Sequence, residues 1–137
     1  MTTPLRCLLG FVAWTLFLLF LIGVARVSKV LAGKAKAGDF PAGVPHGSDP
    51  YWRLNRAHLN CLENLPLFGS VVLIATVAGI RAAILDTLSR VILGARIGQS
   101  LAHLSSGGEV AVNVRFAFFL AQLVCLVMFV LTIARAG

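Results

Sequence analysis

The stretch Arg53-Leu-Asn-Arg-Ala-His-Leu-Asn-Cys-Leu-Glu-Asn-Leu-Pro66 carries charged and amide side chains up to the start of an apolar run, residues 65–80, that has no charge. At helical spacing Arg56, Asn60 and Glu63 stand at i, i+4 and i+7, which places them on a single helix face. A helix with such a face enters a bilayer only at high cost unless the face meets other helices or a wet cavity. The stretch therefore predicts a membrane helix with a polar site on one side.

An interfacial anchor is the alternative interpretation of this polar face. Arginine side chains at helix ends extend to the lipid headgroups, and a nearby carboxylate can pair with one of them. This accounts well for Arg53, three residues before Arg56, but poorly for Glu63, which lies deeper along the helix. We therefore expect a buried site.

The composition excludes a soluble globular domain, since 58% of the residues are hydrophobic and only 12% are charged. Four apolar stretches approach the roughly 20 residues that a membrane span needs. The third stretch contains Asp86, Arg90 and Arg96, so it can span only if its arginines face inward. We predict an all-α integral membrane protein, a single domain over residues 1–137, with four transmembrane helices at about 5–27, 50–81, 84–104 and 112–135.

The net charge of +7 comes largely from basic side chains that flank the connection between the first two helices. By the positive-inside rule this connection is cytoplasmic, and both termini lie on the opposite side. Basic patches interleaved with aromatic residues are missing, so we expect no nucleic acid partner.

A signal peptide is the alternative for the first helix, but a small-x-small cleavage site is missing and the apolar run is longer than a usual signal core.

The three cysteines, Cys7, Cys61 and Cys125, lie in or beside apolar segments and form no CxxC pair. We expect them to be small core residues and not disulfides or metal ligands. In the loop before the second helix, Ser48 or Asp49 is expected to cap that helix, and His46 is expected to be solvated.

A second polar face is predicted on the third helix, where Arg96, Gln99, Ser100 and His103 stand at i, i+3, i+4 and i+7. An unpaired arginine this far from the helix ends is expensive, so we expect Arg96 to meet Glu63 or a bound anion. His103 is either a proton carrier or a hydrogen-bond donor.

Three further residues stand out on the second and fourth helices. Pro66 is expected to bend the second helix just after Glu63. On the fourth helix, spacing alone favours Arg115 as an interfacial anchor, and Gln122, two turns deeper on the same face, as an inter-helix hydrogen-bonding group.

Residues 53–68, with the core Arg-Ala-His-x-Asn-x-x-Glu at 56–63, closely resemble the signature of the MAPEG family, membrane-associated proteins in eicosanoid and glutathione metabolism. Weaker similarity covers Arg26-Val-Ser-Lys, Ser-Asp-Pro at 48–50, Gly94-Ala-Arg and Leu120-Ala-Gln-Leu, so the resemblance extends over most of the chain. The family's tyrosine after the glutamate is Asn64 here, as in the transferase branch. Tyrosines often found on the third helix are replaced by Gln99 and His103.

The resemblance implies a left-handed four-helix bundle that forms a homotrimer, with glutathione in clefts between neighbouring subunits, open toward the cytoplasm. Arg115 matches, to within a residue or so, the arginine that faces the thiol. The residues implied to bind glutathione, with Arg26 supplied by the neighbouring subunit, are Arg26, Arg53, Arg56, His58, Asn60 and Glu63. We add candidates that adjoin this set or lie on the third helix: Asn64, Arg96, Gln99 and His103.

These implications predict a transferase or peroxidase that uses glutathione as co-substrate and acts on hydrophobic electrophiles or lipid hydroperoxides. Its partners would be membrane lipids, a hydrophobic small molecule and two further copies of the chain. A non-catalytic lipid-binding or scaffold protein of the same fold is one alternative. A small ion or metabolite carrier that uses the charged third helix is another.

Overall fold

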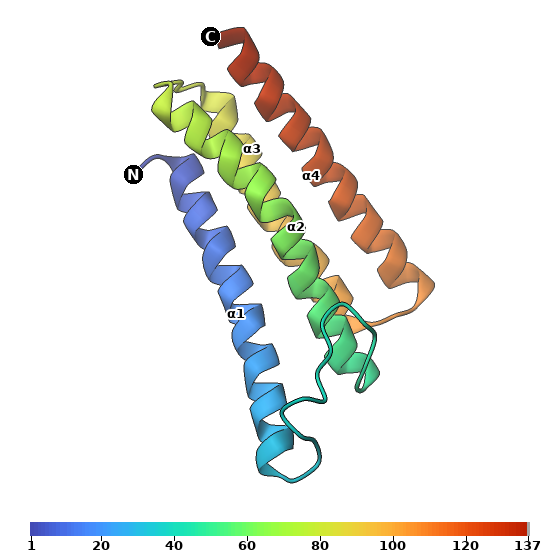
Figure 1. Cartoon of the computed structure of the whole chain (residues 1–137). Helices are drawn as coiled ribbons and strands as arrows, with labels where there is room; N and C mark the ends of the chain where they lie inside the picture. Colours follow the sequence, from blue (N-terminus) through green and yellow to red (C-terminus); the bar gives the residue numbers. More distant parts are fainter. Residues whose placement is uncertain (137) are drawn as a thin grey trace.

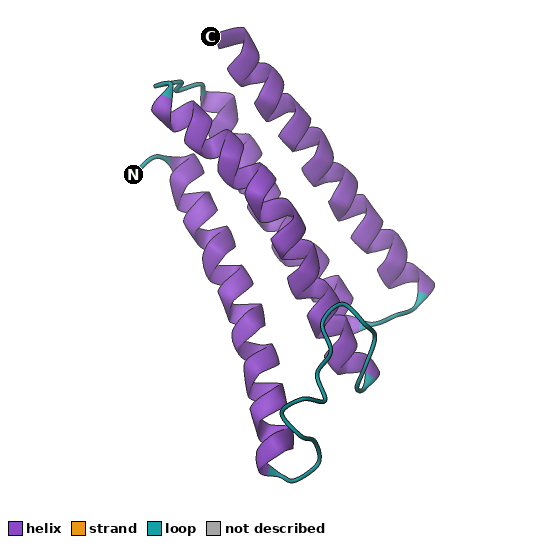
Figure 2. Ribbon diagram, in the orientation of Figure 1, coloured by secondary structure: helices purple, strands orange, loops and turns teal. Residues whose placement is uncertain are grey.

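The computed structural model describes residues 1–136, which form four helices and, within that range, no strand (Figures 1 and 2). The helices are α1 (Thr3–Leu31), α2 (Asp49–Val77), α3 (Ala83–Ser105) and α4 (Glu109–Ala136). The predicted all-α fold with four long helices is confirmed.

The ends of α1 and α2 are set by glycine and differ from the predicted bounds. Gly33 and Gly79 adopt φ values of 69° and 70°, the left-handed conformation that favours glycine. After α2, Gly79 N–H donates to Thr76 O and Ile80 N–H donates to Ala75 O, the two bonds of a Schellman motif. The second helix therefore ends at Val77 and not near residue 81, and α1 continues to Leu31, past the predicted end at 27.

The start of α2 agrees only in part with the sequence analysis. Pro50 lies in the first turn as expected, but the Ser48 hydroxyl makes no capping hydrogen bond. Helix α2 continues without interruption through Pro66.

The helices alternate in direction, so the N- and C-termini lie at the same end of the bundle (Figure 1). Helices α2 and α3 are central: α1 packs on both, and α4 packs mainly on α3 and also touches α2. Within the described residues α1 and α4 make no contact with each other. The loop between α1 and α2 and the link between α3 and α4 share the other end.

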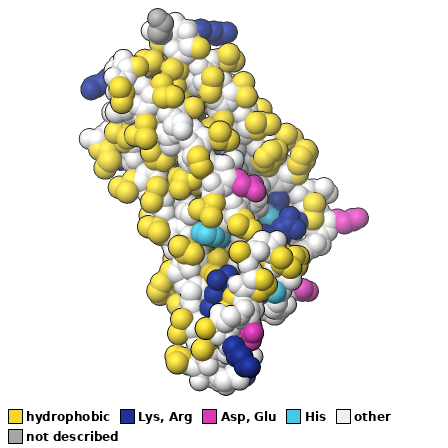
Figure 3. Space-filling model, viewed as in Figure 1, with side chains coloured by type: hydrophobic (Ala, Val, Ile, Leu, Met, Phe, Trp, Pro, Cys, Tyr) yellow, Lys and Arg dark blue, Asp and Glu magenta, His cyan; other side chains and the backbone are white. Residues whose placement is uncertain are grey.

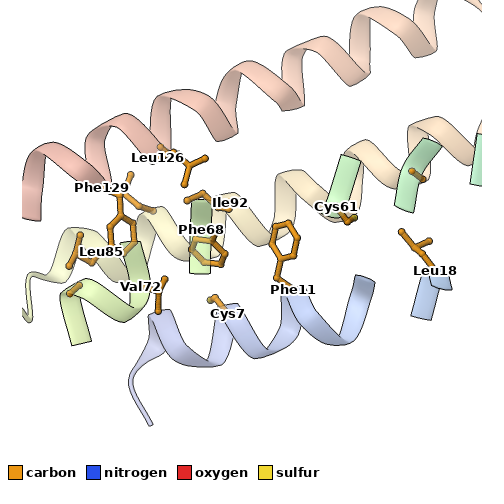
Figure 4. Close-up of a cluster of buried hydrophobic side chains, with 14 residues drawn as sticks. Cys7, Phe11, Leu18, Cys61, Phe68, Val72, Leu85, Ile92, Leu126 and Phe129 are labelled. Carbon is orange, nitrogen blue, oxygen red and sulfur yellow. The ribbon is translucent and has the colours of Figure 1, made fainter. Parts of the chain in front are cut away.

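Apolar side chains from all four helices meet in one core (Figure 4). Phe11 of α1 and Phe68 of α2 lie with ring centroids 5.8 Å apart, and Phe129 of α4 is fully buried. Cys7, Cys61 and Cys125 are free and buried, which confirms their prediction as core residues.

Helices α1, α2 and α4 are long enough and apolar enough to cross a membrane, by length and composition. Helix α3 is not among these three, and it contains Asp86, Arg90 and Arg96. The sequence analysis required both arginines of this helix to face inward if it spans the membrane. Arg96 is buried and meets this condition, whereas Arg90 is exposed and does not. Hydrophobic side chains are widespread on the face shown in Figure 3. Acidic and histidine side chains on this face lie in the half with the α1–α2 loop, and basic side chains lie there and at the opposite end.

Candidate functional site

A three-residue hydrogen-bonded group joins α2, α3 and α4 in the half of the bundle nearer the α1–α2 loop. The side-chain amide of Asn60 lies 2.7 Å from His103 Nε2, and Arg115 Nη1 lies 3.0 Å from His103 Nδ1. His103 is only 4% exposed, while Asn60 and Arg115 are half-buried. The structure thus brings together three residues that sequence analysis placed on three separate helices.

A second polar group lies beside the first and joins the same helices. Gln122 Nε2 donates to Gln99 Oε1 at 3.0 Å and to Phe118 O at 2.9 Å. With both N–H groups used, Gln122 Oε1 accepts from Asn64 Nδ2 at 3.2 Å. Gln122 is fully buried, and its predicted inter-helix hydrogen bond is confirmed.

The charged members of the α2 face point outward from the single chain. Arg56 and Glu63 are exposed, whereas Asn60 and Asn64, a little further round the helix, are half-buried. The core side of α2 is occupied by Ala57, Cys61 and Phe68, so the polar face of α2 lies at the edge of the packed side. The expectation of a buried site therefore stays a prediction, since within one chain the two asparagines are half-buried and the two charged residues are exposed.

Arg96 does not form an ion pair with Glu63, one of the two partners expected for it, and the other, a bound anion, stays a prediction. Its side chain is 2% exposed, and its guanidinium carbon lies 5.7 Å from the ring centroid of Phe11, a cation–π distance. The difference arises because Arg96 faces the bundle interior while Glu63 faces outward. Arg96 Nε has no hydrogen-bond partner within residues 1–136.

A polar contact missed by the sequence analysis lies next to Arg96. Trp14 Nε1 donates to Ser100 Oγ at 3.1 Å, and Ser100 Oγ in turn donates to the Arg96 backbone oxygen at 2.9 Å. This ties α1 to α3. The signal in the sequence was Ser100 at i+4 from Arg96, but nothing in it identified Trp14 as the partner.

His58 and Arg53 lie apart from these hydrogen-bonded groups. His58 follows Arg56 by two residues, which turns it about 200° round the helix and off the Arg56–Glu63 face. His58 Nε2 and Arg53 Nε are buried atoms with no hydrogen-bond partner in the described chain. An unpaired buried polar atom costs about 1–3 kcal/mol, and no contact within residues 1–136 offsets this cost for either atom.

Arg26 is held at the end of α1 by Tyr51, the one tyrosine in the chain. Arg26 Nε donates to Tyr51 Oη at 2.8 Å, and the guanidinium lies over Phe40, 5.3 Å from the ring centroid. His46, expected to be solvated, instead contacts Val44 O at 2.7 Å and Tyr51 Oη at 3.3 Å. The structure brings none of these residues to the Asn60–His103–Arg115 group, and Tyr51 was not among the predicted site residues.

Hollows open on the surface of residues 1–136. One, of about 550 Å³, is lined by Ala102, Val114 and the α3–α4 link, and neither His103 nor Arg115 is part of its lining. Another, of about 480 Å³, lies at the end that carries the termini and includes Arg6, Arg81 and Asp86.

The model of the MAPEG family matches residues 5–135, nearly the whole chain. No curated protein matches the chain. Because the match covers far more than half of the sequence, the chain belongs to the MAPEG family, as its resemblance predicted. Membership and the three apolar helices indicate an integral membrane protein with a role in eicosanoid or glutathione metabolism, broadly defined.

Proposed function

We propose that this MAPEG family member is a glutathione-dependent transferase or peroxidase for hydrophobic substrates. One observation carries the proposal: the exposed charged face of α2 adjoins a hydrogen-bonded group, centred on buried His103, that brings a second arginine, Arg115, from α4. A zwitterionic ligand on this face would lie within reach of the charged α2 side chains and of Arg115.

Glutathione has two carboxylates and one ammonium group, and the α2 face supports binding of both signs of charge. Arg56 suits a carboxylate, which guanidinium groups bind with paired hydrogen bonds. Glu63 suits the ammonium group. Asn64 assists Glu63, because the Asn64 NH₂ group donates to Gln122 and the Asn64 oxygen is left to accept a hydrogen bond from the ammonium group.

Arg115 is proposed to stabilise the glutathione thiolate. The thiolate is the nucleophile, and a free thiol is mostly protonated near neutral pH. A guanidinium has five N–H donors, so Arg115 can contact His103 and still offer donors and charge to sulfur. Each unit by which the bound thiol pKa falls corresponds to about 1.4 kcal/mol.

The thiolate supports either of two reactions. In a transferase, sulfur forms a bond to an electrophilic carbon and the leaving group departs with its electron pair. In a peroxidase, sulfur takes the terminal oxygen of a hydroperoxide and an alcohol leaves; a second glutathione then gives the disulfide and water. The apolar outer surface suits substrates that arrive through lipid.

A homotrimer is part of the proposal. Arg26 of a neighbouring copy would join Arg56 and Arg53 at one site, and the interface would cover the charges exposed on the single chain. The α1–α2 loop, which bears much of the positive charge, would face the cytoplasm, with both termini opposite.

Glutathione affinity tests the proposed binding face. Calorimetric titration of the purified protein is expected to show binding that weakens at least about tenfold in Arg56→Ala and in Glu63→Gln, because each removes a charge-assisted hydrogen bond. Arg81→Ala is the matched control, since this exposed arginine lies at the other end of the bundle. Equal affinity in all four proteins would contradict the proposal.

A non-catalytic lipid-binding or scaffold protein is the second candidate. It is favoured by Gln99 and His103, which replace tyrosines and are engaged inside the chain. Ultraviolet difference absorbance separates the two functions, because an active protein ionises the glutathione thiol on mixing. No thiolate band at saturating glutathione would favour the second candidate.

A further inference from the structure

We infer that His103 is a positioning residue: one imidazole fixes the guanidinium of Arg115 and the amide of Asn60 in a single arrangement. The inference rests on the proposed function for its catalytic consequence. Its structural part stands on the hydrogen bonds alone.

The proton on His103 follows from its partners. Arginine can only donate, so the 3.0 Å contact with Arg115 Nη1 makes His103 Nδ1 the acceptor. A neutral imidazole with a bare Nδ1 carries its proton on Nε2. The Asn60 amide lies with Nδ2 2.7 Å from this Nε2, which would set two donors against each other. Oxygen and nitrogen of an amide are assigned by their hydrogen-bond partners, so we infer that the amide is turned by 180° and that Oδ1 accepts from Nε2.

This arrangement determines what Asn60 offers to a ligand. With its oxygen turned to His103, the NH₂ group of Asn60 faces away from the ring and can only donate. Asn60 is half-buried and lies one turn from exposed Arg56 on the same face of α2. Asn60 therefore joins Arg56 in binding a carboxylate or carbonyl oxygen, while Asn64 presents an acceptor further along the helix.

His103 thus links the α2 binding face to Arg115. The three residues come from three helices, and His103 is the only one of them that is almost fully enclosed. Because Arg115 is half-buried on a long flexible side chain, one enclosed acceptor restricts the positions of its guanidinium. Loss of that acceptor is expected to reduce thiolate stabilisation more than glutathione binding.

Nitrogen NMR of protein labelled only at histidine tests the structural part without any ligand. The His103 signal, assigned by its absence in His103→Gln, is expected to show a protonated Nε2 and a bare Nδ1. His46 is an internal control with the reverse pattern, since its Nδ1 must donate to Val44 O and its Nε2 must accept from Tyr51 Oη. A protonated Nδ1 on His103 would overturn the inference.

Two substitutions at His103 test the catalytic part. His103→Phe removes both hydrogen bonds and is expected to lower the equilibrium constant for thiolate formation about 10- to 100-fold, the range for a hydrogen bond to a charged group. The affinity for glutathione should fall by less than that factor. His103→Gln keeps an acceptor and a donor and is expected to restore most of the thiolate signal.

Trp14→Phe is the matched control for general damage, since it removes a hydrogen bond from the same bundle without touching Arg115. It should leave thiolate formation unchanged. Wild-type thiolate formation in His103→Phe would refute the positioning role, as would equal loss in Phe and Gln variants of comparable stability. Absence of thiolate in the wild type would instead count against the proposed function, while the NMR result would still decide the histidine arrangement.

Discussion

Gln122 is the buried polar side chain of α4, and its amide serves three partners on three segments. Gln122→Leu would leave Gln99 Oε1 buried and unpaired, so we expect a loss of about 1–3 kcal/mol in the free energy of unfolding. Thermal or denaturant unfolding in detergent measures it. Adding Gln99→Leu to Gln122→Leu removes the unpaired acceptor and should recover part of the lost stability. A stability loss in the double variant that exceeds the sum of the losses in the two single variants would contradict this account.

Side-chain partners were the least predictable feature at this scale. The spacing of Arg56, Asn60 and Glu63 correctly indicated one face, because helical periodicity is local. Which residue meets His103 depends on how α2, α3 and α4 pack, and no local pattern encodes that. Arg96 shows the same limit, because its position predicted Glu63 or a bound anion as its partner, and within the chain the ring of Phe11 lies beside it.

At the scale of elements, Gly98 allows α3 and α4 to approach closely. A Cβ at this position would lie 2.6 Å from Phe118 Cζ, so Gly98→Ala forces the ring to move. We expect a loss of about 1–3 kcal/mol in stability, together with weaker thiolate formation, because the same helix pair places His103 against Arg115. Unfolding and thiolate absorbance, measured on the same preparation, give both values.

Gly94, one turn earlier on α3, provides the control. A Cβ there meets nothing within 4 Å. Gly94→Ala should therefore be neutral or stabilising, by up to about 1 kcal/mol from helix propensity. Phe118→Leu combined with Gly98→Ala should restore stability, and failure of this rescue would show that the ring contact is not the cause.

Helix type and number followed from the sequence because long apolar runs require helices in lipid. The ends were less well predicted. Gly79 lies two residues past Val77 and terminates α2 by its backbone conformation, whereas hydropathy continues through Ile80. The predicted end near residue 81 followed hydropathy and missed the Schellman motif.

At the scale of the whole molecule, a subunit-mixing experiment tests the proposed sharing of a site between neighbouring copies. Arg26→Ala and Arg56→Ala subunits are each expected to bind glutathione weakly when assembled alone. In mixed assemblies the intact α2 face of one copy meets the intact Arg26 of its neighbour, so a fraction of the sites should regain wild-type affinity. Titration after co-expression, with the assembled mass measured in detergent, provides the readout.

If Arg26 serves the site of its own chain, where it lies against Tyr51, every mixed site lacks one arginine and no recovery occurs. A mass other than three copies would exclude the trimer whatever the affinities show.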